Sequence, residues 1–178
     1  FNSYNDYSQY VKTLIKANTI DEPTKIWWDI RPHHIYPTLE FRICDCCTTV
    51  DEAVGIAAII QALVAKMIDL RNNNQTWRNY RSSLISENKW RAMKNGINSK
   101  LIDFGKQKEI PYDNLISEIL EFIDDVVDRL GTREKIEQFV KDTLKKGTSA
   151  DRQITEYNKN KNINSVVDML VEETISGC

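Results

Sequence analysis

The stretch RPHHIYPTLEFRICDCCTTVDEA, residues 31–53, contains the change from strand to helix that decides the fold of this chain. Residues 38–45 alternate apolar and polar side chains, which is typical of a half-buried β-strand. Glu40 and Arg42 lie on the polar face of that strand. Thr49 and Glu52 then form the pattern of a capping box, which predicts the start of a helix.

A second strand is expected directly upstream, over residues 26–31, and Pro32 is expected to end its ladder. Paired side by side in a suitable register, the two strands would bring Asp29 and Arg31 onto the same polar surface as Glu40 and Arg42. Two strands alone rarely form a stable sheet, so we expect them to join a larger antiparallel sheet. Their opposite, apolar face is expected to point inward and consists of Trp28, Ile30, Leu39, Phe41 and Ile43.

The rest of the chain is predicted to be mainly helical. Residues 53–65 are apolar nearly all round the helix, apart from Gln61, which predicts a buried helix that ends at 72–74. A loop is expected over 103–111. The fold class is therefore α+β, a mostly helical chain that carries a few strands of an antiparallel sheet. The other expected helices cover residues 5–17, 77–94, 114–130, 132–146, 150–157 and 166–171.

Composition narrows the class of protein. With 178 residues, the chain has room for one domain, or one domain with an added helical lobe. Its 24 Lys and Arg against 26 Asp and Glu give a formal charge of −2, without a broad basic surface for nucleic acid or an anionic membrane. The longest apolar stretch, residues 53–64, is too short to span a bilayer, and no signal peptide opens the chain. We expect a cytoplasmic protein that binds neither nucleic acid nor membrane. A first residue Phe1 in place of Met suggests a fragment or a processed chain.

The four cysteines do not predict a disulfide framework or a zinc site. Cys44, Cys46 and Cys47 crowd within four positions, where bridging geometry is poor, and Cys178 stands alone. We expect the first three to be small reduced side chains that pack near the start of a helix. The pair His33-His34 lacks partner ligands nearby, which favours a turn feature over a metal site.

Glu40 and Arg42 have two interpretations on pattern alone. A solvent-facing ion pair is the normal state of the polar face of a half-buried sheet. The functional alternative is a carboxylate that holds a hard cation, beside a guanidinium that clamps an anionic substrate.

Three blocks carry a resemblance that bears on this choice. They are KIWWDIRPHHIYPTLEFRICDCCTTVDEAVGIAAIIQALVA from residue 25, ENKWRAMKNGINSKLIDF from residue 87 and GTSADRQ from residue 147. In content, order and spacing the chain resembles the carboxylate–amine ligase family, the bacterial second-type glutamate–cysteine ligases. The resemblance covers nearly the whole chain. It implies the C-terminal part of a single ligase catalytic domain, with strands over about 26–45, a helical region over about 49–176 and an N-terminal half that is absent.

The resemblance also implies a glutamine-synthetase-like catalytic sheet and a reaction. ATP would phosphorylate the carboxylate of glutamate, or of a similar amino acid, and an amine such as cysteine would displace the phosphate. ATP and Mg²⁺ are the implied cofactors, and a homodimer or higher oligomer is the implied assembly. Arg31 is similar to the family's phosphate-contacting arginine, Glu40 to its magnesium ligand, and Arg42 to the arginine that faces the reacting carboxylate or phosphate.

Three points remain open beside the resemblance. Lys94-Asn95 stands where the family has Arg-Tyr, and lysine keeps the charge without the bidentate fork of a guanidinium. Arg91 and Arg152 lie in family-like motifs without an assignable role, and the amine acceptor is not identified. The alternative function is a non-catalytic helical interaction module that retains the ligase scaffold. In either case this chain alone is expected to be inactive, because most of the site would lie in the absent half.

Overall fold

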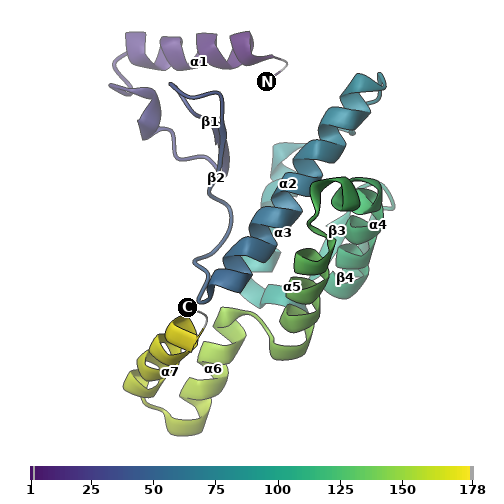
Figure 1. Cartoon of the computed structure of the whole chain (residues 1–178). Helices are drawn as coiled ribbons and strands as arrows, with labels where there is room; N and C mark the ends of the chain where they lie inside the picture. Colours follow the sequence, from purple (N-terminus) through teal and green to yellow (C-terminus); the bar gives the residue numbers. More distant parts are fainter. Residues whose placement is uncertain (2, 177–178) are drawn as a thin grey trace. The chain divides into compact units, whose positions relative to one another are not determined.

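The computed structural model describes residue 1 and residues 3–176. These residues are mostly helical and form two small antiparallel sheets, which confirms the α+β class. The chain divides into two compact units, Phe1–Cys46 and Cys47–Cys178, here called the N-terminal unit and the helical unit (Figure 1). Each sheet has two strands. The larger glutamine-synthetase-like sheet and the single catalytic domain therefore stay predictions.

The N-terminal unit begins with α1 (Tyr4–Lys16), within one residue of the helix expected at 5–17. Its buried Tyr7 and Val11 pack together with Ile26, and the partly buried Trp28 lies against them. This small aromatic and aliphatic cluster is the core of the unit.

Both strands are shorter than the sequence predicts. β1 (Ile30–Pro32) pairs antiparallel with β2 (Leu39–Phe41), in place of strands over 26–31 and 38–45. Pro32 is the last residue of β1, which agrees with the expected end of its ladder. Upstream of β1 lies the 3-10 turn η1 (Pro23–Lys25), and the carbonyl oxygens of Thr24 and Ile26 accept from the Arg31 side chain instead of a strand partner.

The apolar face of the strand pair is not buried as expected. Ile30, Leu39 and Ile43 are 48%, 51% and 51% exposed, so the inward orientation predicted for them is wrong. Only Trp28 of that set packs on the buried cluster of the unit. A strand pair of only three residue pairs has little surface on which other elements can pack. Among the described residues no third strand extends it.

The core of the helical unit lies where α2 (Val50–Asn72), α4 (Tyr112–Leu130) and α5 (Arg133–Lys146) pack together (Figure 1). Gly55 permits the approach of α5, because a Cβ at this position would lie 2.4 Å from the side chain of Phe139. The buried core residues are Ala58, Ala62, Ile116, Ile123, Val126, Val127, Ile136 and Val140.

Within this chain the apolar helix after residue 52 is not buried all round, contrary to expectation. Within α2 only Gly55, Ala58 and Ala62 are buried, because α4 and α5 cover one face of the helix and leave the other exposed. Among the described residues, α2 is also the one helix that is long and apolar enough to cross a membrane, by length and composition alone.

The second sheet was missed from the sequence. β3 (Lys100–Asp103) and β4 (Lys108–Pro111) form a hairpin across the segment expected to be a loop at 103–111. A carboxylate oxygen of Asp103 accepts hydrogen bonds from the backbone N–H groups of Gly105 and Lys106, both at 2.8 Å, and these bonds close the turn. Side-chain to backbone bonds of this kind leave no periodic signal in a sequence.

The helices around this hairpin differ slightly from expectation. α3 (Ser82–Asn95) starts five residues later than predicted, and η2 (Gly96–Asn98) follows it. At the C-terminal end, α6 (Ser149–Asn160) and α7 (Ile163–Ser176) lie side by side (Figure 1). α6 extends past the break expected at 158 and ends at Asn160, where the left-handed Lys161 caps it.

Candidate functional site

Arg31 and Glu40 face each other across the strand pair, because the register of β1 and β2 places them directly opposite. The Nε–H of Arg31 donates to one carboxylate oxygen of Glu40. Its Nη1 donates to the carbonyl oxygens of Thr24 and Ile26, at 2.7 and 2.8 Å. Only 14% of the Arg31 side chain is exposed. The guanidinium is therefore held in one orientation by three hydrogen bonds.

Arg42 completes the cluster from the other side of the carboxylate. Its Nη1 donates to the second oxygen of Glu40 at 2.9 Å. The guanidinium lies 5.4 Å from the centre of the Trp27 ring, within the range of a cation–π contact. With 39% of its side chain exposed, Arg42 is more open to solvent than Arg31. We call Arg31, Glu40 and Arg42 the Arg–Glu–Arg cluster.

The cluster carries a net charge of about +1, from two guanidinium groups and one carboxylate. Hydrogen bonds from Arg31, and then from Arg42, lower the pKa of Glu40 below its ordinary value against the opposing effect of desolvation. Among the described residues, no partner accepts from Nη2 of Arg31 or from Nε and Nη2 of Arg42. The cluster thus offers donors and positive charge to an anion.

The predicted polar surface is confirmed in its geometry, since the three side chains contact one another. The roles assigned to them stay predictions. A hard cation such as Mg²⁺ takes about six oxygen ligands. Residues 1 and 3–176 contain no group of three or more His, Cys, Asp or Glu that could hold a metal ion. A magnesium site at Glu40 would therefore need its other oxygen ligands from outside these residues.

The histidine pair next to the cluster forms a turn. Nδ1 of His33 accepts hydrogen bonds from the backbone N–H groups of Ile35 and Tyr36, both at 3.1 Å. His33 thereby uses one of its two ring nitrogens within the loop, which agrees with a turn feature.

The packing expected for the cysteines is wrong for Cys44 and Cys46, which are exposed. β2 ends at Phe41, so these residues lie in irregular chain and not on a covered strand. Cys47 is half-buried, and none of the three is in a disulfide. Cys178 lies outside the described residues.

Replacing Cys44, Cys46 and Cys47 together by serine is expected to change the free energy of unfolding by less than about 1 kcal/mol, because surface substitutions have small effects. Metal analysis of the purified chain should find no stoichiometric zinc. One zinc per chain, lost together with folding in the triple variant, would show that this expectation is wrong.

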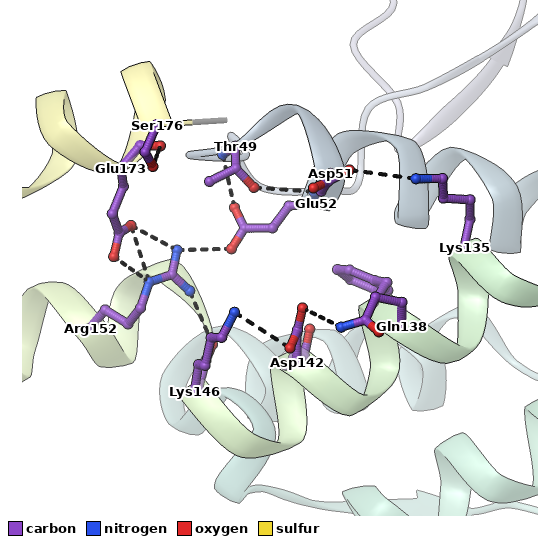
Figure 2. Close-up of a pocket in the computed structure, with 13 residues that line it drawn as sticks. Thr49, Asp51, Glu52, Lys135, Gln138, Asp142, Lys146, Arg152, Glu173 and Ser176 are labelled. Carbon is purple, nitrogen blue, oxygen red and sulfur yellow. Dashed lines mark hydrogen bonds and ion pairs between the residues drawn. The ribbon is translucent and has the colours of Figure 1, made fainter. Parts of the chain in front are cut away.

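A second cluster of charges lies in a pocket of about 360 Å³ between α2, α5, α6 and α7 (Figure 2). Figure 2 shows Arg152 between Glu52 and Glu173. Arg152 donates to Glu52 at 2.8 Å, to Glu173 at 3.0 Å, and to the carbonyl oxygen of Gly147 at 3.1 Å. Its donors are used within the protein. Arg152 of α6 therefore ties together α2, through Glu52, and α7, through Glu173.

Arg152→Met is expected to lower the free energy of unfolding by about 2 kcal/mol, because two half-buried carboxylates lose their common cation. Urea denaturation measures the change. Arg129→Met is the matched control, since Arg129 makes one exposed ion pair with Asp69, a contact worth less than about 1 kcal/mol. Equal losses in the two variants would contradict a special role for Arg152.

The Arg152 contribution is also expected to depend on pH. Burial raises the pKa of Glu52, but hydrogen bonds from Arg152, Thr49 and Thr48 lower it by more, so the pKa lies below its ordinary value of 4.5. A carboxyl whose pKa is lowered by folding stabilises the protein above the unfolded value and loses that effect as the pH falls through the folded value. The difference between wild type and Arg152→Met should therefore shrink below about pH 4.5.

The remaining basic residues in family-like motifs support the hairpin. Arg91 of α3 donates to Glu87 at 2.8 Å and to Glu109 at 2.6 Å, which joins α3 to β4. Asn88 binds both backbone groups of Ile102 in β3, at 2.9 and 2.7 Å. Lys94 lies 4.8 Å from the centre of the exposed Trp90 ring. These polar residues are visible in the sequence, but no sequence pattern indicates which residues they contact.

Comparison with known protein families agrees with these features. The family model described as glutamate–cysteine ligase family 2 matches residues 1–172. A protein of Herpetosiphon aurantiacus named "Putative glutamate--cysteine ligase 2" is 48% identical over 177 residues, which are 99% of this chain and 46% of that protein. Proteins of the same name from Solibacter usitatus and Chloroflexus aggregans are 48% and 47% identical, with 99% of this chain and 46% and 45% of their own length covered. The chain spans about half the length of the curated relatives it matches.

Proposed function

Because the chain belongs to glutamate–cysteine ligase family 2, we propose that it acts as part of a full-length ATP- and magnesium-dependent ligase. This ligase joins glutamate, or a similar amino acid, to an amine such as cysteine. The observation that carries the proposal is the Arg–Glu–Arg cluster, in which a fixed carboxylate lies between two guanidinium groups with open donors. The part of the ligase outside this chain supplies the rest of the site.

The proposed reaction passes through an acyl phosphate. A carboxylate oxygen of the amino acid attacks the γ-phosphorus of ATP, and the bond to ADP breaks. The amine nitrogen then attacks the acyl carbon, the bond from that carbon to the phosphate oxygen breaks, and phosphate leaves as the amine loses a proton. The first step places negative charge on the transferring phosphoryl group and the second on the leaving phosphate, and fixed donors stabilise such charge without reorganising.

Within this reaction Arg42 holds the reacting carboxylate or phosphoryl oxygens through its open Nε and Nη2 donors. Arg31 contacts the phosphates of ATP, and its two carbonyl partners keep its guanidinium in place. Glu40 orients both guanidinium groups and would hold the magnesium ion. Magnesium, when bound, neutralises charge on the phosphates.

We also propose that the ligase is a cytoplasmic homodimer or higher oligomer that acts on small molecules.

Transfer of ¹⁸O tests this reaction class. Glutamate labelled with ¹⁸O in its carboxylates is incubated with ATP, magnesium, cysteine and the full-length ligase, and the phosphate product is analysed by mass spectrometry. The acyl-phosphate route predicts one ¹⁸O in each phosphate released. Unlabelled phosphate would contradict that route. If no ADP forms in the presence of both substrates, the result would favour the non-catalytic interaction module.

A further inference from the structure

α2 has two apolar faces, and the structure covers only one of them. The inner face packs on α4 and α5 through Gly55, Ala58 and Ala62. The outer face follows the three- and four-residue spacing of one helix side and runs from Val50 to Ile68. Among the helical unit's described residues no element buries it. Its exposed members are Val50, Ala53, Val54, Ala57, Gln61, Met67 and Ile68.

The size and chemistry of this outer face differ from those of an ordinary surface helix. It extends for about 27 Å along the helix axis, at about 1.5 Å per residue. Val50, Val54 and Ile68 are 55%, 40% and 53% exposed, and Gln61 is the only polar residue among the exposed members of the face. Exposed apolar side chains at both ends of one helix face, with alanines between them, are typical of an interaction site.

A lipid bilayer fits this face poorly. The C-terminal half of α2 is fixed to α4 by two ion pairs, Lys66–Asp125 at 2.6 Å and Asp69–Arg129 at 2.7 Å. Insertion of α2 into a membrane would carry these charged groups into hydrocarbon, which is costly. The face therefore suits an apolar protein surface that lies along α2 and leaves its charged flank in water.

The curated relatives indicate where such a surface comes from. The chain matches only 46% of the Herpetosiphon aurantiacus relative, although 99% of the chain takes part in the match. About half of the ligase thus lies outside the matched span. We propose that the outer face of α2 is the docking surface for this remaining part of the ligase polypeptide, which packs an apolar surface against residues 50–68. The proposal rests on family membership and on the solvent exposure of the outer face of α2. It does not depend on the reaction proposed above.

Site-specific cross-linking in the full-length ligase tests this directly. A benzophenone amino acid replaces Ala57, at the centre of the outer face, and irradiation is followed by mass spectrometry of the cross-linked peptides. We expect cross-links to peptides outside the 178-residue span. The same probe at Glu134, an exposed position on α5, is the matched control and should give none. Cross-links to a second copy of α2, to residues 1–46 or to lipid, or no cross-link from position 57, would overturn the proposal.

A charge on the outer face provides an independent readout. Val54→Glu is compared in this 178-residue chain and in the full-length ligase by thermal unfolding. In the chain alone the new carboxylate stays in water, so a change in Tm below about 2 °C is expected. In the full-length ligase the carboxylate becomes buried without a partner, and a fall of at least about 5 °C is expected. A similar change in both proteins, small or large, would overturn the proposal, whether or not the ligase is active.

Discussion

Glu40→Gln is expected to lower the turnover number of the full-length ligase by about 10²- to 10³-fold, with the fold unchanged. Glutamine keeps the shape of the side chain but removes the charge that holds both Arg31 and Arg42. It is also a poorer ligand for a hard cation than a carboxylate. Steady-state ADP release with saturating glutamate, cysteine and MgATP measures the change, and circular dichroism checks the fold.

The matched control for this prediction is Glu22→Gln. Glu22 belongs to the same unit, is exposed, and has a weak ion pair with Lys25 at 4.0 Å. Its replacement should leave the turnover number within about twofold of wild type, as for a surface substitution away from a site. Activity of Glu40→Gln close to that of the control would remove Glu40 from the site and leave the solvated ion pair as the better interpretation.

Arg42→Lys is expected to lose about 10²-fold in turnover, nearly as much as Arg42→Ala. Lysine keeps the positive charge, but it lacks the planar guanidinium that donates to Glu40 through Nη1 and leaves Nε and Nη2 for the proposed anion. Comparing the kinetics of the two variants separates charge from geometry. Arg129→Lys, at a 57% exposed arginine, is the control and should keep full activity. If Arg42→Lys retains most of the activity, the site uses charge and not the shape of the guanidinium.

The sequence predicted the Arg–Glu–Arg cluster because two local rules agree there. Alternation placed Glu40 and Arg42 on one strand face, and antiparallel pairing brought Arg31 opposite Glu40. The same alternation overestimated the length of both strands. Thr24 and Ile26 use their carbonyl oxygens for Arg31, and such a contact between a side chain and a distant backbone group has no periodic signal.

The positions of the helices in the sequence were easier to predict than the elements that pack against them. Gly131 and Gly147 directly follow α4 and α5, and their positive φ angles of 67° and 79° are those that glycine adopts readily at a helix end. The burial of α2 was predicted from its composition alone, and composition does not say which neighbours are present. In this chain α4 and α5 cover one side of α2. The hairpin of β3 and β4 was missed for a related reason, since Asp103 and Asn88 stabilise it through single contacts.

A crystal structure of the full-length ligase with magnesium, a non-hydrolysable ATP analogue and glutamate tests the central claim most directly. The account predicts a carboxylate oxygen of Glu40 at about 2.1 Å from a magnesium ion, the usual length of a magnesium–oxygen bond. It also predicts donors of Arg31 and Arg42 within about 3 Å of phosphate or substrate oxygens. A nucleotide bound elsewhere, with Glu40 still held only by its two arginines, would contradict the account.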